Sequence, residues 1–216
     1  MPDLNFEVVG AKAPAFAAVP MLLFKLRISN TDEQERIYNV ALRCQIQIAA
    51  TRRRYSSEAQ ERLLEVFGEP HRWGETVKSF LWTHASVVVP QFTGSVLVDL
   101  PVPCTYDFEV VSTKYFDAVE DGDIPLLFLF SGTIFYEGQQ GYMQVGQISW
   151  SKEAEFRLPV AVWKEMIARY YPNSAWICLH KDVFDQLYRY KARHGLPTWE
   201  DVIAHLLQAS SEEVQS

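Results

Sequence analysis

Long runs of alternating apolar and polar residues constrain the fold of this chain more than any other feature of its sequence. The clearest run places apolar side chains at five alternate positions, which are Val40, Leu42, Cys44, Ile46 and Ile48. Because side chains alternate between the two faces of a β-strand, this pattern predicts a half-buried strand. Comparable runs, with one continuous apolar run, predict about seven strands over residues 4–8, 22–28, 40–48, 80–89, 95–102, 125–136 and 142–150.

Turn-forming residues separate these strands and favour antiparallel pairing. Asn30-Thr31-Asp32 follows the second run, and Gly138-Gln139-Gln140-Gly141 is typical of a hairpin loop. The simplest fold is therefore α+β, a mainly antiparallel immunoglobulin-like β-sandwich with inserted helices and a C-terminal helical extension. A closed barrel is the alternative.

Two connections between strands carry helical spacing instead of alternation. An apolar stripe predicts a helix within residues 57–67, and Ser57 followed by Gln60 fits a capping box at its start. Residues 108–119 are ambiguous, although apolar residues at a spacing of four favour a helix there.

The C-terminal part of the chain differs from the rest in its periodicity. Apolar residues at spacings of three and four predict helices beginning near Val160, Asp182 and Trp199, with a short strand over residues 175–180. We therefore expect three parts, a β-sandwich domain with inserted helices over 1–157, a helix-strand-helix-helix extension over 158–209 and a disordered tail over 210–216.

Charge and cysteine content limit the classes of partner and the compartment. With 20 Lys and Arg against 27 Asp and Glu, the net charge of −7 gives no general attraction to nucleic acid or to anionic membranes. Three cysteines without a CxxC pair, and an acidic N-terminus where a signal peptide would be basic, predict a cytoplasmic protein. The most apolar stretch, residues 125–130, is too short to span a bilayer.

No local motif for catalysis, cofactor binding or metal binding is present in the sequence. A Walker A loop, a GxGxxG loop after a strand, a GxSxG elbow and an HExxH pair are all missing. We therefore expect no cofactor and no metal site. One enzymatic alternative stays open, in which Cys104 is a loop thiol that His84 activates, although a buried structural role for Cys104 is also consistent with its position at a strand end.

Two features suggest a protein-binding surface. Arg52, Arg53 and Arg54 precede a predicted helix, where cations oppose the helix dipole, so helix stability does not explain them. Arginine suits bidentate contacts with carboxylates and phosphates. With Tyr55 and Trp82 they are the predicted partner-binding residues, because aromatic side chains concentrate interface energy. The structural alternatives are a solvated loop for the arginines and core packing for Trp82.

The stretch 176–187, together with 195–207, resembles a ribbon-helix-helix module, which has one strand and two capped helices. Such modules dimerise through the strand and usually read DNA with it. The outward strand residues here would be Trp176, Cys178 and His180, which are not the side chains that read base edges. Basic and acidic residues also balance in this segment, so we expect packing or dimerisation, and a homodimer is left open.

The whole chain also resembles an uncharacterised bacterial family of about this length, whose members have no established activity. The segments that carry the resemblance are Leu42-Arg43-Cys44-Gln45-Ile46, Arg52-Arg53-Arg54-Tyr55, Phe80-Leu81-Trp82-Thr83-His84, Asp99-Leu100-Pro101-Val102-Pro103-Cys104-Thr105-Tyr106-Asp107 and Leu127-Phe128-Leu129-Phe130-Ser131-Gly132. Genes of this family often lie beside clusters for uptake [NiFe] hydrogenases. The resemblance therefore implies an accessory role whose partner is a hydrogenase subunit or a maturation factor.

The leading expectation for function is a non-enzymatic protein-interaction or accessory factor, assisting assembly or maturation of a [NiFe] hydrogenase. The second hypothesis is an enzyme with a dispersed Cys/His site, which requires Cys104 and His84 within hydrogen-bond reach. The third is a DNA-binding regulator that acts through the C-terminal module, which requires a basic face.

Overall fold

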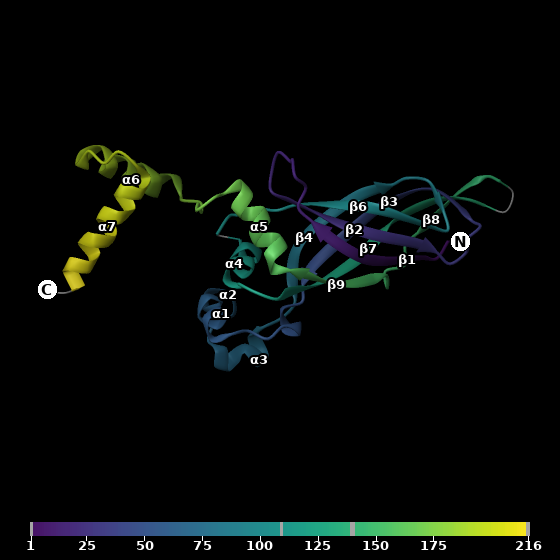
Figure 1. Cartoon of the computed structure of the whole chain (residues 1–216), viewed down its shortest axis with the longest axis horizontal. Helices are drawn as coiled ribbons and strands as arrows, with labels where there is room; N and C mark the ends of the chain where they lie inside the picture. Colours follow the sequence, from purple (N-terminus) through teal and green to yellow (C-terminus); the bar gives the residue numbers. More distant parts are fainter. Residues whose placement is uncertain (1, 109, 139–140, 215–216) are drawn as a thin grey trace. The chain divides into compact units, whose positions relative to one another are not determined.

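The computed structural model describes residues 2–108, 110–138 and 141–214 and contains two compact units, Met1–Trp176 and Ile177–Ser216. The first unit holds nine strands and five of the seven α-helices in the described residues (Figure 1). The strands are β1 (Leu4–Lys12), β2 (Met21–Asn30), β3 (Arg36–Ile48), β4 (Phe80–Val89), β5 (Phe92–Thr93), β6 (Ser95–Pro103), β7 (Asp123–Glu137), β8 (Met143–Gln147) and β9 (Glu153–Pro159).

Two antiparallel sheets form the framework of the first unit. One has the strand order β1-β2-β6, and the other has the order β4-β3-β7-β8, with β5 paired to β3 and β9 paired to β7. All these pairings are antiparallel, so the expected mixed fold dominated by antiparallel sheets is confirmed. The strands form two separate sheets, in contrast to the closed barrel that the sequence left open.

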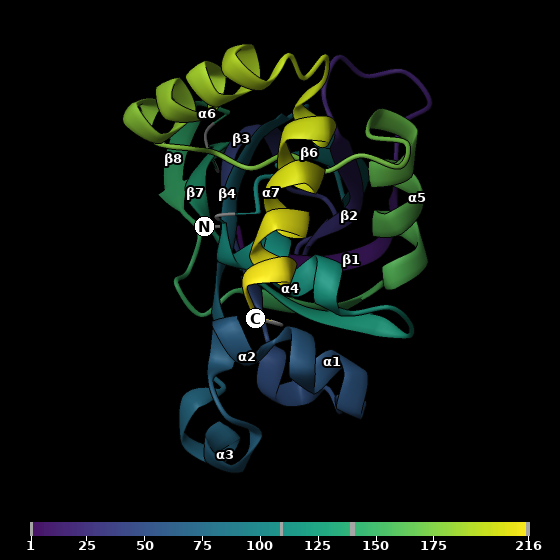
Figure 2. The ribbon, with the colours of Figure 1, turned by 90° about the vertical axis from the view of Figure 1, so that its left-hand side faces the viewer.

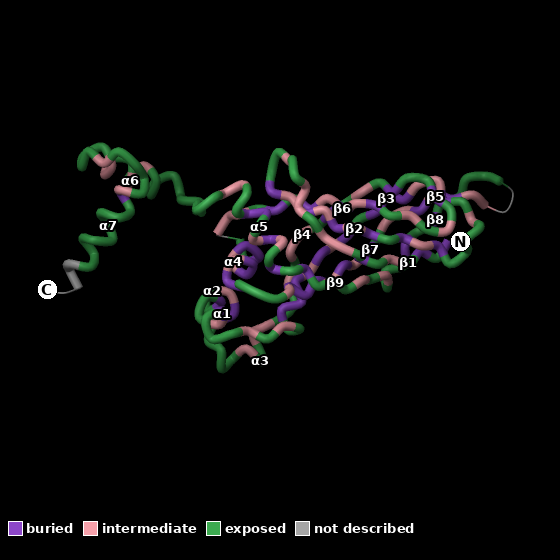
Figure 3. Tube along the Cα trace, viewed as in Figure 1, coloured by how far each residue is buried: buried purple, intermediate pink, exposed green. Residues whose placement is uncertain are grey.

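The two sheets share one apolar core, which appears as the purple segments inside the sheets in Figure 3. Phe24 of β2 is fully buried and meets Phe128 of β7 and Phe156 of β9 edge to face, while Phe6 of β1 stacks on Phe130 of β7. Offset or edge-to-face aromatic pairs add to the stabilisation that burial of their area provides. The aromatic content of the chain therefore joins the sheets face to face.

Helices α1 to α5 gather at one end of the two sheets (Figure 1), and Figure 2 looks onto this end, with α1, α2 and α3 grouped next to α4. Phe116 of α4 stacks on Trp163 of α5, which ties these two helices to the core. The helices are α1 (Ser57–Arg62), α2 (Leu64–Phe67), α3 (Trp73–Thr76), α4 (Val111–Ala118) and α5 (Val160–Tyr170), with two short 3-10 helices, η1 (Ala50–Arg52) and η2 (Pro70–Arg72).

The predicted helix at 57–67 forms, but it is divided at Leu63 and its cap differs from the prediction. The residue that caps α1 is Ser56, whose hydroxyl accepts a hydrogen bond from the Ala59 backbone N–H, and not Ser57. Serine is a favourable cap at either position, so the sequence pattern could not choose between these neighbours. The ambiguous segment before residue 119 is helical from Val111 to Ala118.

The second unit contains two helices, α6 (Lys181–His194) and α7 (Trp199–Val214). The prediction of a strand at 175–180 is wrong, because the described backbone there makes only an isolated bridge between Trp176 and Asp107. The tail predicted as disordered continues α7 as far as Val214, and residues 215–216 lie outside the described part of the chain. Helix α5 belongs to the first unit, which extends past the predicted boundary at residue 157, and the domain division stays a prediction. None of the helices among the described residues has the length and apolarity that crossing a membrane requires.

We expect Phe24→Ala to lower the free energy of unfolding by about 3–5 kcal/mol, because it removes a fully buried ring that contacts both sheets. Urea unfolding followed by tryptophan fluorescence measures this loss. Leu97→Ala is the matched control, since Leu97 is 53% exposed on β6 and its loss should change stability by about 0.5 kcal/mol or less. Equal losses for the two variants would contradict this description of the core.

Candidate partner-binding site

The four consecutive residues of the predicted docking segment do not point the same way. Arg52 is the last residue of η1, and the other three follow it before α1. Arg53 and Tyr55 are partly buried, whereas Arg52 and Arg54 are exposed. This alternation follows from the extended backbone at Arg53, because successive side chains in an extended segment lie on opposite sides. The segment therefore has an inner pair and an outer pair of side chains.

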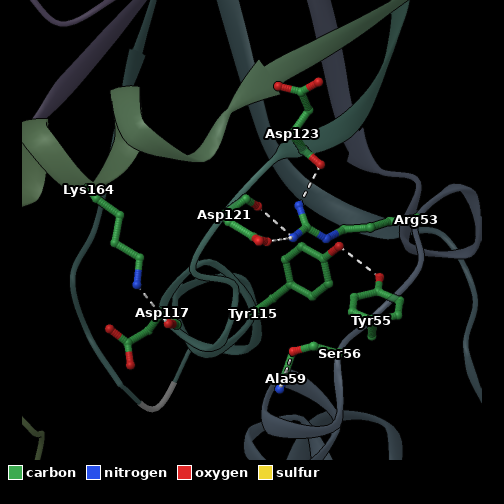
Figure 4. A network of polar contacts seen from close by, with 9 residues as sticks. All are labelled: Arg53, Tyr55, Ser56, Ala59, Tyr115, Asp117, Asp121, Asp123 and Lys164. Carbon is green, nitrogen blue, oxygen red and sulfur yellow. Dashed lines mark hydrogen bonds and ion pairs between the residues drawn. The ribbon is translucent and has the colours of Figure 1, made fainter.

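Arg53 binds the turn that connects α4 to β7, as Figure 4 shows. Its Nη1 donates to the Asp123 carbonyl oxygen at 2.7 Å, and its Nη2 donates to the Asp121 carbonyl oxygen at 2.6 Å. The same Nη2 forms an ion pair with Asp121 Oδ1 at 3.2 Å, and the side chain is only 11% exposed. Gly122 has a φ of +64°, a conformation that glycine adopts without strain, and lies between these two acceptors. Arg53 is therefore committed to an internal contact.

Tyr55 takes part in a second internal contact of the same network (Figure 4). Its hydroxyl donates to the Ala50 carbonyl oxygen at 2.7 Å and lies 2.8 Å from the Tyr115 hydroxyl on α4. Because the Tyr55 proton goes to Ala50, Tyr115 is the donor of the second bond. Burial raises the pKa of both phenols above the ordinary value of 10.0, so both remain neutral at physiological pH.

The outer pair leaves a weaker basic surface than the sequence suggests. Arg52 forms an ion pair with Glu155 of β9. Arg54 is exposed and has no hydrogen bond or ion pair with any described residue. It lines a hollow of about 440 Å³ with equal numbers of basic and acidic side chains. These charged side chains are Arg53, Arg54, Arg62, Glu58, Glu120 and Asp121. Of the predicted arginine patch, Arg54 is the exposed member without an ion pair, and Arg52 is exposed but paired with an exposed glutamate.

Trp82, the aromatic member of the predicted site, packs against the core. Its ring contacts Phe24, Phe116 and Trp163, and these contacts leave the side chain partly buried. Strict alternation along β4 would place His84 on the same face as Trp82, but the register of β4 on β3 shifts between the pairs Ile46–Thr83 and Gln47–Leu81. Such a β-bulge reverses the inside–outside order, so His84 is exposed and pairs with Gln45 on the outer face.

Cys104 and His84 do not form the site that the enzymatic hypothesis requires. Cys104 is buried, its thiol lies 3.3 Å from the Val102 carbonyl oxygen, and burial raises its pKa to about 12. Because thiolate is the nucleophilic form, a protonated thiol facing the core is unsuited to catalysis. His84 faces away from the core, in a hollow with Arg43, Gln45, Ser86 and Ser131. Among the described residues, no group of three His, Cys, Asp or Glu side chains is arranged to hold a metal ion.

The exposed apolar edge at β8 was not predicted from the sequence. Tyr142, Met143 and Val145 are mostly exposed there, and Trp150, just after the strand, is 91% exposed. β8 is the last strand of its sheet and pairs with β7. The signal in the sequence is the absence of any Asp, Glu, Lys or Arg from Gly138 to Ser151.

Comparison with known proteins places the chain in a family. The model of a family of unknown function, DUF6084, matches residues 1–215. The chain belongs to this family. This confirms the expected membership of an uncharacterised family and shows neither the link to hydrogenase clusters nor the ribbon-helix-helix module. No curated protein matches the chain.

Two solved structures give weak likenesses. One is the CARDB domain of the PF1109 protein from Pyrococcus furiosus, in complex with di-metal ions, with 12% identity, a TM-score of 0.27 and coverage of 73% of this chain and 92% of that chain. The other is the putative ApaA protein from Bordetella pertussis, with 16% identity, a TM-score of 0.24 and coverage of 73% and 93%. TM-scores in this range carry no argument about fold or function.

Arg53→Ala and Arg54→Ala should differ in their effect on stability. Arg53→Ala removes the donors for two backbone carbonyls and should lower the free energy of unfolding by about 1–3 kcal/mol. Arg54→Ala should change it by about 0.5 kcal/mol or less, as an exposed side chain without a partner. Arg53→Lys keeps the charge but lacks the forked donors, so full stability of this variant in urea unfolding would contradict the contact.

A single thiol per folded chain should react with a thiol-specific reagent at mildly alkaline pH. Cys178 is exposed, whereas Cys44 and Cys104 are buried with pKa values raised from 9.0 to about 12. Their protonated forms stabilise the folded state fully below pH 9, and this contribution is lost as pH rises towards 12. Mass spectrometry after timed alkylation measures the sites, and fast labelling of Cys104 in the folded protein would contradict the structure.

Proposed function

We propose that this protein is a non-enzymatic protein-interaction factor whose edge strand β8 binds an extended segment of another protein as an additional strand. The observation that carries the proposal is the uncharged, apolar and exposed edge that β8 gives to its sheet. Strand addition to a sheet edge is a recurrent mode of peptide recognition, in which backbone hydrogen bonds provide affinity and alternate side chains provide specificity.

The environment of β8 distinguishes it from other edge strands of the two sheets. The edge strand β4 lies against β6, and β9 lies against β1, so each has a strand of the opposite sheet beside it. Within the described part of the chain, β8 packs along β7 and along no other strand. The backbone groups on its outer edge therefore have no strand partner within the described chain.

The side chains of β8 lack the features that protect exposed edges from association. Proteins usually place Lys, Pro, a bulge or an inward-pointing charge on such an edge. β8 has none of these, and its register on β7 runs without a bulge from Glu137–Met143 to Thr133–Gln147. The lack of protection supports a β8 edge that is covered by a bound strand in the functional complex.

The outer face next to this edge is mixed, with apolar side chains among polar ones. Val145 pairs with Phe135 of β7, whereas the adjoining row runs from Gln147 through Thr133 and Ala41 to Val88 of β4. A sheet face exposed to water ordinarily carries polar side chains. Alternate apolar side chains of an added strand would lie next to Met143 and Val145 on this face.

The narrower forms of this proposal concern the fold type and the partner. The chain order of the strands, β1-β2-β6 in one sheet and β4-β3-β7-β8 in the other, supports an immunoglobulin-like sandwich with strands A-B-E and C′-C-F-G. An accessory role in assembly of a [NiFe] hydrogenase rests on the family resemblance, with a hydrogenase subunit or maturation factor as the source of the bound segment. The free thiols of Cys44, Cys104 and Cys178 support a reducing cytoplasm.

The test is an affinity pull-down of tagged full-length protein from its native cytoplasm, with wild type, the two lysine variants Val145→Lys and Val88→Lys, and Arg54→Ala in parallel. A lysine on β8 should lower the amount of retained stoichiometric partner at least about tenfold, because lysine blocks edge pairing. Val88 is similarly exposed but lies on β4, so Val88→Lys should retain the partner. Quantitative mass spectrometry measures retention, and urea unfolding confirms that both variants are folded.

Each outcome of this pull-down has a distinct meaning. A partner lost from both lysine variants indicates docking on the sheet face and contradicts strand addition at the edge. A partner lost from Arg54→Ala, but not from Val145→Lys, returns the site to the arginine segment. If no stoichiometric protein is retained by abundant wild-type protein, the interaction function itself is contradicted.

A further inference from the structure

The unit Ile177–Ser216 has almost no core of its own. In residues 177–211, whose side chains the structure describes, Val202 is the one buried side chain. Figure 3 shows α6 and α7 as almost wholly green or pink. Gly195 ends α6 in the left-handed conformation, and Thr198 and Asp201 form reciprocal hydrogen bonds that start α7. The two helices are therefore well capped but poorly buried.

Large apolar side chains form one stripe on each helix. On α6 they recur at positions 183, 184, 187 and 188, and on α7 at positions 199, 202, 203, 206 and 207. These spacings of three and four place them on one face of each helix. Phe184 and Tyr188 contact Trp199, so the two stripes meet. Exposed members of this apolar face, with the segment before α6, are Ile177, Leu179, Val183, Phe184, Tyr188, Trp199, Ile203, Leu206 and Leu207.

A unit of this size and composition is not stable as it stands. Pieces of roughly 40 residues usually need disulfides, metals or oligomerisation to fold. No disulfide is formed, and no metal-binding group is present in the described residues. The stripes must therefore be covered by another surface.

The area of the apolar face matches what a stable dimer requires. Large side chains bury roughly 150–250 Å² each, so nine of them at about half exposure offer on the order of 900 Å². A standard interface buries about 800 Å² on each partner. Two copies of the unit would form four helices around one shared core, which is the architecture of a helix bundle.

Charge favours a second copy as the occupant of this face. On α6 the charged residues Asp182, Asp185, Arg189 and Arg193 lie on the side of the helix opposite its stripe. Lys191 lies within the stripe, but its ammonium group donates to the carbonyl oxygens of Leu196 and Pro197 in the same unit. Lys181 borders the stripe, with its ammonium group over the Phe184 ring, but it forms an ion pair with Asp185 of the same helix. Two copies can therefore meet through these stripes with little like-charge repulsion, although each chain carries a net charge of −7.

We propose that residues 177–216 are a homodimerisation module, in which the apolar face of α6 and α7 packs against the same face of a second copy. A two-fold interface of this kind uses the same patch on both subunits, so an apolar patch always faces an apolar patch. The ammonium groups in or beside this face, those of Lys181 and Lys191, are already paired or hydrogen-bonded within the same chain, so the face offers little charge that would select a different protein. The module is separate from the β8 edge, so it extends the interaction function without depending on it.

Light scattering of the full-length protein after size exclusion tests the module. Wild type should have about twice the chain mass of 24.9 kDa at tens of micromolar. Leu207→Asp places a carboxylate on an exposed position of the stripe and should give the mass of one chain. Gln208→Asp is the matched control, because it adds the same charge to the opposite side of α7 and should remain dimeric.

Subunit exchange gives a second readout, because energy transfer between wild-type chains does not depend on the folding of any variant. Cys178 is the exposed cysteine of the three, so donor and acceptor dyes can be attached there. Mixing labelled wild-type chains should produce energy transfer, which excess unlabelled Gln208→Asp removes and excess Leu207→Asp does not. Wild type that stays monomeric, as it would if this face packed on its own chain, overturns the proposal. A Leu207→Asp variant that stays dimeric overturns it too, and loss of the dimer in Val145→Lys would assign dimerisation to β8.

Discussion

Aromatic packing between the two sheets is the interaction on which the first unit depends. Phe24 brings β2 against β7 and β9, and the stacked pair Phe116–Trp163 extends the same core under α4 and α5. Trp82 joins the two parts, since it contacts both Phe24 and this pair. Because α4 is held by this core, the turn after α4 stays within reach of Arg53, and the polar network at this end follows from apolar packing.

The sequence predicts the sheets better than it predicts the site, and the reasons are physical. Alternation over β3 is a local signal, so the strand and its buried face could be found without a structure. β9 carries charges at Glu153, Glu155 and Arg157, and its short alternation was therefore missed. A strand predicted at 175–180 does not form, because a short apolar segment does not specify a pairing partner.

The candidate site depended on side-chain directions that no local pattern records. Three consecutive arginines look equivalent in sequence, yet Arg53 is held by carbonyl groups about 70 positions further along the chain. A contact between residues so far apart forms only when the chain has folded, so no local pattern predicts it. The bulge in β4 places His84 outside and Trp82 inside, which reverses the face that strict alternation assigns to one of them. By contrast, the charge-free stretch at β8 was visible in the sequence, but its exposure was not.

The two proposed surfaces differ in the kind of contact that each can make. The β8 edge offers backbone hydrogen bonds and few side chains, which suits a short extended segment bound with modest affinity. The α6–α7 face offers apolar area, and the charges beside it are paired within the same chain, which suits a permanent contact with an identical surface. A dimer would carry two β8 edges, so a partner with two copies of the segment would bind the second edge at a high effective concentration. Weak edge pairing would then suffice for a stable complex, provided that the linker between the two segments spans both edges.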